Sequence, residues 1–149
     1  MKQKVLFLCT GNSCRSQMAE GWLRHLAGDR FEAKSAGTHP VGLNPMTATA
    51  MQEIGVDVRH QRSKHVDEFK GQFFAYVITV CDRAKESCPV FPGAVNVRHW
   101  CFDDPAALPP PGRLEAFRRV RDEIRDRLCQ FLAEEGKPIL LFCALICVG

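Results

Sequence analysis

The sequence lacks the features that assign a chain to a membrane or to nucleic acid. It has 149 residues and a formal net charge of +3, and no apolar run reaches the ~20 residues that a membrane-spanning helix needs. Basic residues are interleaved with acidic ones, so there is no basic stripe for nucleic acid or an anionic membrane. We therefore expect no nucleic-acid or membrane partner. The length and the 46% hydrophobic content predict one domain over residues 1–149.

The eight cysteines follow neither a zinc-site pattern nor a secreted disulfide framework. No pair has the Cys-x-x-Cys spacing of a zinc ribbon, and the five histidines form no His-x3-5-His pair near cysteines, since His60 and His65 have no cysteine close by in the sequence, so we expect no metal. The apolar run Val5 to Leu8 is too short for a signal peptide and enters a polar loop without a small-residue cleavage site. We therefore expect a cytoplasmic protein with reduced thiols. Separately, we expect a monomer.

Strand and helix patterns alternate along the chain. Buried strands are predicted at 5–8, 31–36, 73–80 and 94–97, and amphipathic helices at 13–27, 45–54 and 114–131. The strand at 73–80 is rich in β-branched and aromatic residues and does not alternate with polar ones, as in a central strand covered on both faces. The sequence thus predicts an α/β fold of three layers, α/β/α, with a four-stranded central parallel sheet.

One segment predicts an anion site at the end of the first strand. It reads Cys9-Thr10-Gly11-Asn12-Ser13-Cys14-Arg15-Ser16 and opens the first predicted helix. Backbone N–H groups of such a loop converge on an oxyanion, so Thr10 to Ser16 form the candidate substrate-binding loop, and Gly11 lets it turn. The same dipoles favour a nucleophilic thiolate at Cys9. Arg15 is placed to grip two oxygens of a tetrahedral anion.

The segment Cys9 to Gly21 resembles the active-site loop and first helix of the thioredoxin-coupled arsenate reductases. That family is similar in fold to the low-molecular-weight protein tyrosine phosphatases. The resemblance continues through Ser35-Ala36-Gly37, Asn44-Pro45, His99-Trp100 and Phe102 to Ala106, and it covers nearly the whole chain up to about residue 135. It implies that Asn12 and Ser16 hold the loop by hydrogen bonds and that Cys14 packs rather than reacts.

A proton donor is expected in the loop that begins with Asp103-Asp104-Pro105. Departure of a leaving group from an oxyanion needs such a donor. Proline biases the preceding residue toward an extended backbone, which helps to project Asp104. The family resemblance also implies the aspartate directly before proline, so Asp104 is the candidate acid and Asp103 a loop-stabilising neighbour. Cys101, where the family resemblance implies glycine, weakens this assignment.

Two further cysteines distinguish a reductase from a phosphatase. Cys81 follows the central strand and therefore opens at the same edge of the sheet as Cys9, and Cys88 comes seven residues later. Cys81 is the candidate to attack a Cys9–arsenic adduct, and Cys88 to form a Cys81–Cys88 disulfide for thioredoxin to reduce. Seven helical residues rise roughly 10 Å, whereas disulfide Cα atoms lie within about 7 Å. We therefore expect the segment to unwind on oxidation if it is helical when reduced.

The resemblance also raises the question of a bound cation. Some members of the family bind potassium through an Asn, a Glu, a Ser and an Asp, and this chain has Asn12, Glu20 and Ser35 but Lys64 in the fourth place. The Lys64 ammonium is able to replace the cation, so we predict no cofactor and little potassium dependence. An equally supported alternative is that Glu20 and Lys64 are unrelated surface charges with no part in a cation site.

Two other functions remain as alternatives. A low-molecular-weight protein tyrosine phosphatase would need only Cys9, Arg15 and Asp104, with water resolving a phosphocysteine. A non-enzymatic arsenical sensor would bind without turnover and leave Arg15 and Asp104 without a purpose. Glutaredoxin or mycothiol remains an alternative reductant. No role is assigned to the apolar end at 140–149 or to four further cysteines: Cys101, Cys129, Cys143 and Cys147.

Overall fold

A computed structural model describes residues 2–81, 94 and 96–135. Its four strands form one parallel sheet in the order β2-β1-β3-β4. Their bounds are Gln3–Cys9 for β1, Phe31–Gly37 for β2, Tyr76–Thr79 for β3 and Asn96–His99 for β4. The predicted α/β class with a four-stranded parallel sheet is therefore confirmed. β1 and β3 occupy the centre, and the register pairs Cys9 with Gly37 at the edge where the loop begins.

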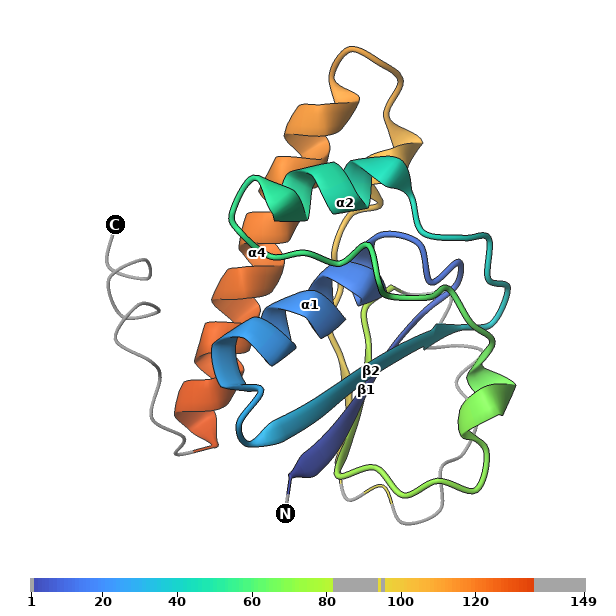
Figure 1. Ribbon diagram of the computed structural model, residues 1–149, viewed down its shortest axis with the longest axis vertical. Helices are drawn as coiled ribbons and strands as arrows, with labels where there is room; N and C mark the ends of the chain where they lie inside the picture. The colour runs from blue at the N-terminus through green and yellow to red at the C-terminus, as the bar shows by residue number, and fades with distance from the viewer. Residues whose placement is uncertain (1, 82–93, 95, 136–149) are drawn as a thin grey trace.

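Three α-helices lie in the described part of the chain: α1 at Arg15–Ala27, α2 at Pro45–Gln52 and α4 at Arg113–Glu134. In Figure 1, α1 and α4 run beside the sheet, and α2 packs against α4 and α1. Asn44 caps α2, because its side chain accepts a hydrogen bond from the Met46 N–H at 2.9 Å and Pro45 stands in the first turn. No helix of the described residues is long and apolar enough to span a membrane.

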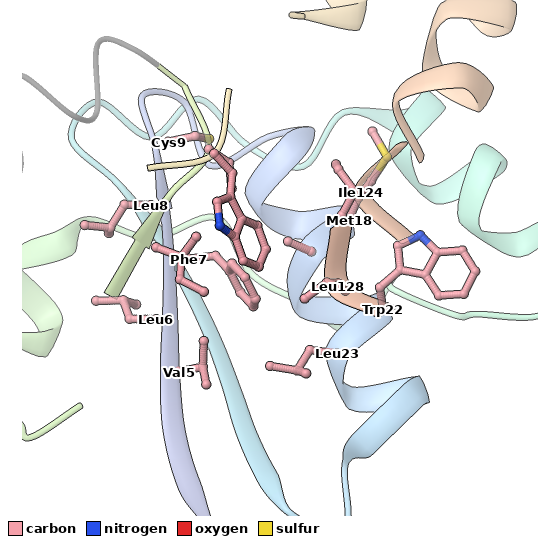
Figure 2. Packing of buried hydrophobic residues seen from close by; sticks show 14 of the residues in the cluster. Val5, Leu6, Phe7, Leu8, Cys9, Met18, Trp22, Leu23, Ile124 and Leu128 are labelled. Carbon is pink, nitrogen blue, oxygen red and sulfur yellow. The ribbon is translucent and has the colours of Figure 1, made fainter. Parts of the chain in front are cut away.

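The strand β1 is buried on both faces, which explains its continuous apolar run. Figure 2 shows Val5 and Phe7 pointing toward α1 and α4, whereas Leu6 and Leu8 point to the other side of the strand. All four side chains are fully buried. The helices supply Met18, Trp22, Leu23, Ile124 and Leu128 to this core. The core holds β1 rigidly and so determines where its last residue, Cys9, lies.

The third strand is shorter than predicted. Its expected first residue, Phe73, is exposed, and the ring of Phe74 packs edge-on against Phe69 at 5.7 Å between centroids. Phe69 belongs to a 3-10 helix, η1 at Val66–Phe69, that the sequence pattern did not predict. The aromatic residues at 73 and 74 therefore belong to the approach to β3, because Phe74 packs on η1 instead of continuing the ladder.

Candidate active site

A cavity of about 700 Å3 opens at the carboxyl ends of β1 and β3. It brings together four of the predicted functional residues: Cys9, Arg15, Cys81 and Asp104. The fifth, Cys88, lies outside the described residues. Cys14 and Cys101 also line the cavity. The strand ends, the first loop and a late loop thus meet around one space that is large enough for a tetrahedral oxyanion.

The Cys9 sulfur has two hydrogen-bonding contacts with residues that follow it in the chain. The Asn12 backbone N–H donates to Cys9 Sγ at 3.2 Å, and the Ser16 hydroxyl lies 2.9 Å from the same sulfur. The side chain is 3% exposed and faces the cavity. Hydrogen bonds to sulfur stabilise a thiolate over a thiol, so this environment suits a nucleophile.

The loop turns at Asn12 rather than at Gly11. Asn12 has φ 46°, and no other non-glycine residue in the described part of the chain has a positive φ. Gly11 instead leaves room for Val41, whose Cγ2 would be 3.1 Å from a Cβ at that position. Asparagine tolerates the left-handed region better than most residues, which is why it can take the turn.

Buried polar side chains hold Asn12 from behind. Its Nδ2 donates to Ser16 Oγ at 2.9 Å and to Ser35 Oγ at 3.0 Å, and Ser35 donates to Glu20 Oε1 at 2.9 Å. Lys64 donates its backbone N–H to Asn12 Oδ1 at 2.9 Å, and its ammonium lies 3.7 Å from Glu20 Oε1. Asn12 and Ser16 therefore have the loop-holding contacts expected of them.

The Lys64 ammonium and Glu20 form a buried pair, not two unrelated surface charges. The Lys64 side chain is 10% exposed and the Glu20 side chain 7%. Burial lowers the pKa of Lys64, while the Glu20 carboxylate opposes that shift. Lys64 Nζ also donates to Arg62 O at 2.9 Å. The Lys64 ammonium thus lies beside Glu20, one of the residues that the family resemblance implied for a cation site.

Arg15 joins the anion loop to the acid loop. Its Nη1 donates to Phe102 O at 3.1 Å, and its Nη2 lies 4.0 Å from Asp104 Oδ2. Its Nε is buried, and no described residue accepts a hydrogen bond from it. The guanidinium is therefore held at the cavity with donor capacity left for an oxyanion.

Asp104 has the extended backbone that proline was expected to impose, with φ −77° and ψ 109°. Its Oδ1 accepts from the Ala106 N–H at 3.0 Å and caps a short 3-10 helix, η2 at Pro105–Ala107. Its other oxygen, Oδ2, faces Arg15. Asp103 points away, to Arg119 at 3.2 Å. Both acids line the cavity, but only Asp104 approaches the candidate anion-binding arginine with a side-chain oxygen.

Cys81 lies at the end of β3 beside the loop. Its Sγ is 3.6 Å from Thr10 Oγ1, and its side chain is buried. Cys14 is also buried, at the N-terminus of α1, and this burial raises the pKa of its thiol. A raised pKa disfavours the thiolate, which agrees with the packing role expected for Cys14.

Sequence reasoning missed Gly37 as a support of the loop. A Cβ there would lie 2.5 Å from Thr10 O and 2.9 Å from Asn12 N, so only glycine lets the end of β2 approach the loop this closely. The glycine after the Ser35-Ala36 pair was the available clue. Among the described residues, no group of three or more His, Cys, Asp or Glu side chains is arranged to bind a metal ion.

The comparisons with known proteins agree with this geometry. Residues 4–138 match the family model described as low molecular weight phosphotyrosine protein phosphatase. The chain belongs to this family. Its predicted three-layer α/β/α fold is the fold of the family and is thereby confirmed.

Relatives within the family carry more specific names. An arsenate reductase of Bacillus subtilis is 46% identical over 140 residues, which cover 92% of this chain and 100% of the relative. A solved arsenate reductase in the phosphate binding state is 32% identical, with a TM-score of 0.71 over 89% of this chain and 98% of the other. A thioredoxin-dependent arsenate reductase of Corynebacterium glutamicum is 26% identical, with a TM-score of 0.64 over 89% of this chain and 63% of the other.

Proposed function

We propose that this enzyme reduces arsenate to arsenite in the cytoplasm, as an arsenic detoxification step, through a relay of Cys9, Cys81 and Cys88 that thioredoxin regenerates. The observation that carries the proposal is that Cys9, Cys81, Arg15 and Asp104 line one cavity. The names of the relatives support arsenate as the substrate. The name of the Corynebacterium glutamicum relative supports thioredoxin as the reductant.

The first step forms a bond between sulfur and arsenic. Arsenate binds with its oxygens toward the loop N–H groups and the Arg15 guanidinium. The Cys9 thiolate attacks arsenic, the bond from arsenic to one hydroxyl group breaks, and this hydroxyl leaves as water after accepting a proton from Asp104. The product of this step is a covalent Cys9–arsenic(V) adduct.

The second step reduces arsenic. The Cys81 thiolate attacks Cys9 Sγ, the sulfur–arsenic bond breaks, and its electron pair remains on arsenic, which leaves as arsenite. Cys88 then attacks Cys81 and expels Cys9 as a thiolate. Thioredoxin supplies two electrons and two protons to the resulting Cys81–Cys88 disulfide. Cys9 and Cys81 lining one cavity supports the first exchange, and the seven-residue spacing from Cys81 to Cys88 supports the second.

We further propose that the Lys64 ammonium takes the place of a bound potassium ion. Its contact with Glu20 at 3.7 Å supports this, because Glu20 is linked through Ser35 to Asn12. Wild-type turnover should then be the same in potassium and sodium salts at equal ionic strength. Lys64→Asp should acquire a potassium dependence. A wild-type rate that falls when sodium replaces potassium would contradict the proposal.

The family description favours one second candidate, a phosphatase that uses Cys9, Arg15 and Asp104 alone. NADPH consumption with arsenate, thioredoxin and thioredoxin reductase separates the two functions when aryl phosphate hydrolysis is measured in parallel. Sustained NADPH consumption with weak hydrolysis supports the reductase. Brisk hydrolysis without arsenate-dependent NADPH consumption would make the protein a phosphatase.

A further inference from the structure

The side chain of Gln17 lies behind the anion loop, outside the cavity. It belongs to α1 and is fully buried. Its Nε2 lies 3.0 Å from Asn12 O, 3.0 Å from Asn12 Oδ1 and 3.2 Å from Arg62 O. The two N–H groups of this amide thus lie within hydrogen-bonding distance of three carbonyl oxygens, two of which belong to Asn12. These contacts attach both the backbone and the side chain of Asn12 to the helix.

Asn12 needs such an attachment because it is the left-handed residue of the loop. A residue with a Cβ keeps a positive φ at a cost in free energy, and surrounding contacts must offset that cost. The same residue supplies both routes of hydrogen bonding to the nucleophile. Its N–H donates to Cys9 Sγ at 3.2 Å, and its Nδ2 donates to Ser16 Oγ, which lies 2.9 Å from that sulfur.

A second buried amide sets the direction of these hydrogen bonds. Gln61 Nε2 donates to Gln17 Oε1 at 2.8 Å and to Gln17 O at 3.0 Å, while Gln61 Oε1 accepts from Arg24 Nη2. Arginine can only donate, so Gln61 must present its oxygen to Arg24 and its nitrogen to Gln17. Gln17 must then present its own nitrogen to Asn12. The chain of donors therefore runs one way, from Arg24 to the loop.

We propose that Gln17 is a positioning residue for the nucleophile: its amide holds Asn12 in the left-handed conformation and so directs the Asn12 N–H to Cys9 and the Asn12 Nδ2 to Ser16. The inference rests on Cys9 as the nucleophile but not on arsenate as the substrate. It is tested on the reactivity of Cys9 itself. If the wild-type protein did not reduce arsenate, the proposed function would be overturned, but this inference would still hold.

The test compares Gln17→Met with Gln61→Met by iodoacetamide alkylation across pH, followed on the Cys9 peptide by mass spectrometry. Both variants remove a buried amide, but only the first removes the contacts to Asn12. Arg15, Asp103 and Asp104, the charged residues that line the cavity, stay the same in both. We expect Gln17→Met to raise the midpoint pH of Cys9 alkylation by about one unit, or roughly tenfold less thiolate below the midpoint.

Gln61→Met should lower the Tm by about as much as Gln17→Met does. It should raise the midpoint pH of Cys9 alkylation by less than half of the shift that Gln17→Met causes. The inference is overturned if both variants lose stability while the Cys9 midpoint stays at the wild-type value, or if both move it equally. If Gln17→Met does not fold, Gln17→Asn replaces it, because the shorter amide no longer reaches Asn12. The same upward shift is then expected, and an unchanged midpoint overturns the inference.

Discussion

The two sides of the cavity are built differently. On the anion side, the loop is supported from behind by Asn12, Ser16 and Gln17, which are fully buried and linked by hydrogen bonds. On the acid side, Asp103 and Asp104 are exposed. Arg15 contacts this loop at Phe102 O and lies 4.0 Å from Asp104 Oδ2. The difference shows which side chains must be held rigidly. An oxyanion needs hydrogen-bond donors in fixed positions, whereas water can partly replace a side chain that donates a proton.

The largest effect should come from the anion side. Arg15→Lys should lower kcat/KM for arsenate by about 10³-fold, because a lysine cannot reproduce a bidentate contact with two oxygens. Steady-state kinetics of the coupled reaction measure this loss. Arg119→Lys, an exposed arginine that pairs with Asp103, is the control and should keep the wild-type rate. Equal losses in both variants would contradict a specific role for Arg15.

The acid side should show a smaller effect. Asp104→Asn should lower kcat by about 10²-fold, near the low end for a general acid, because its exposed position lets water donate the proton in part. The matched control is Asp103→Asn, which we expect to stay within about threefold of the wild type, since a surface ion pair contributes little. If Asp103→Asn lowered kcat more than Asp104→Asn, the assignment of Asp104 as the proton donor would be wrong.

A change behind the loop should act through stability. Gly37→Ala would place a Cβ 2.5 Å from Thr10 O, and we expect it to lower the free energy of unfolding by about 2 kcal/mol. Arsenate binding should weaken with it, because Asn12 is displaced as well. Urea unfolding measures the stability, and Gly112→Ala, whose Cβ meets nothing within 4 Å, is the control. Equal stability of the two variants would argue against the close approach.

The smallest effect should be at Cys14. Burial raises the pKa of its thiol, so its thiolate forms at a higher pH than an ordinary thiol and its alkylation at pH 8 should be at least about tenfold slower than that of Cys9. Cys14→Ser should keep kcat/KM within about threefold. Mass spectrometry of the two peptides measures the rates, and faster labelling of Cys14 would contradict its packing role.

The sequence was most informative where local chemistry dominates. The strand, loop and helix around Cys9 were predictable because an apolar run, a short polar loop and helical spacing follow one another between residues 5 and 27. The pairing of Arg15 with Asp104 and of Thr10 with Cys81 was not, since these contacts depend on how distant strand ends meet. The buried Lys64–Glu20 pair and the η1 packing of Phe74 also depend on tertiary contacts, which periodicity does not encode.

The central claim is the three-cysteine relay, and a single-turnover experiment with Cys88→Ser tests it most directly. Reduced variant is mixed with excess arsenate without thioredoxin, and arsenite and disulfides are measured. The account predicts one arsenite per chain and a Cys9–Cys81 disulfide, whereas the wild type yields a Cys81–Cys88 disulfide. The relay would be contradicted if neither protein released arsenite. It would also be contradicted if the Cys88→Ser variant formed a disulfide that does not include Cys81.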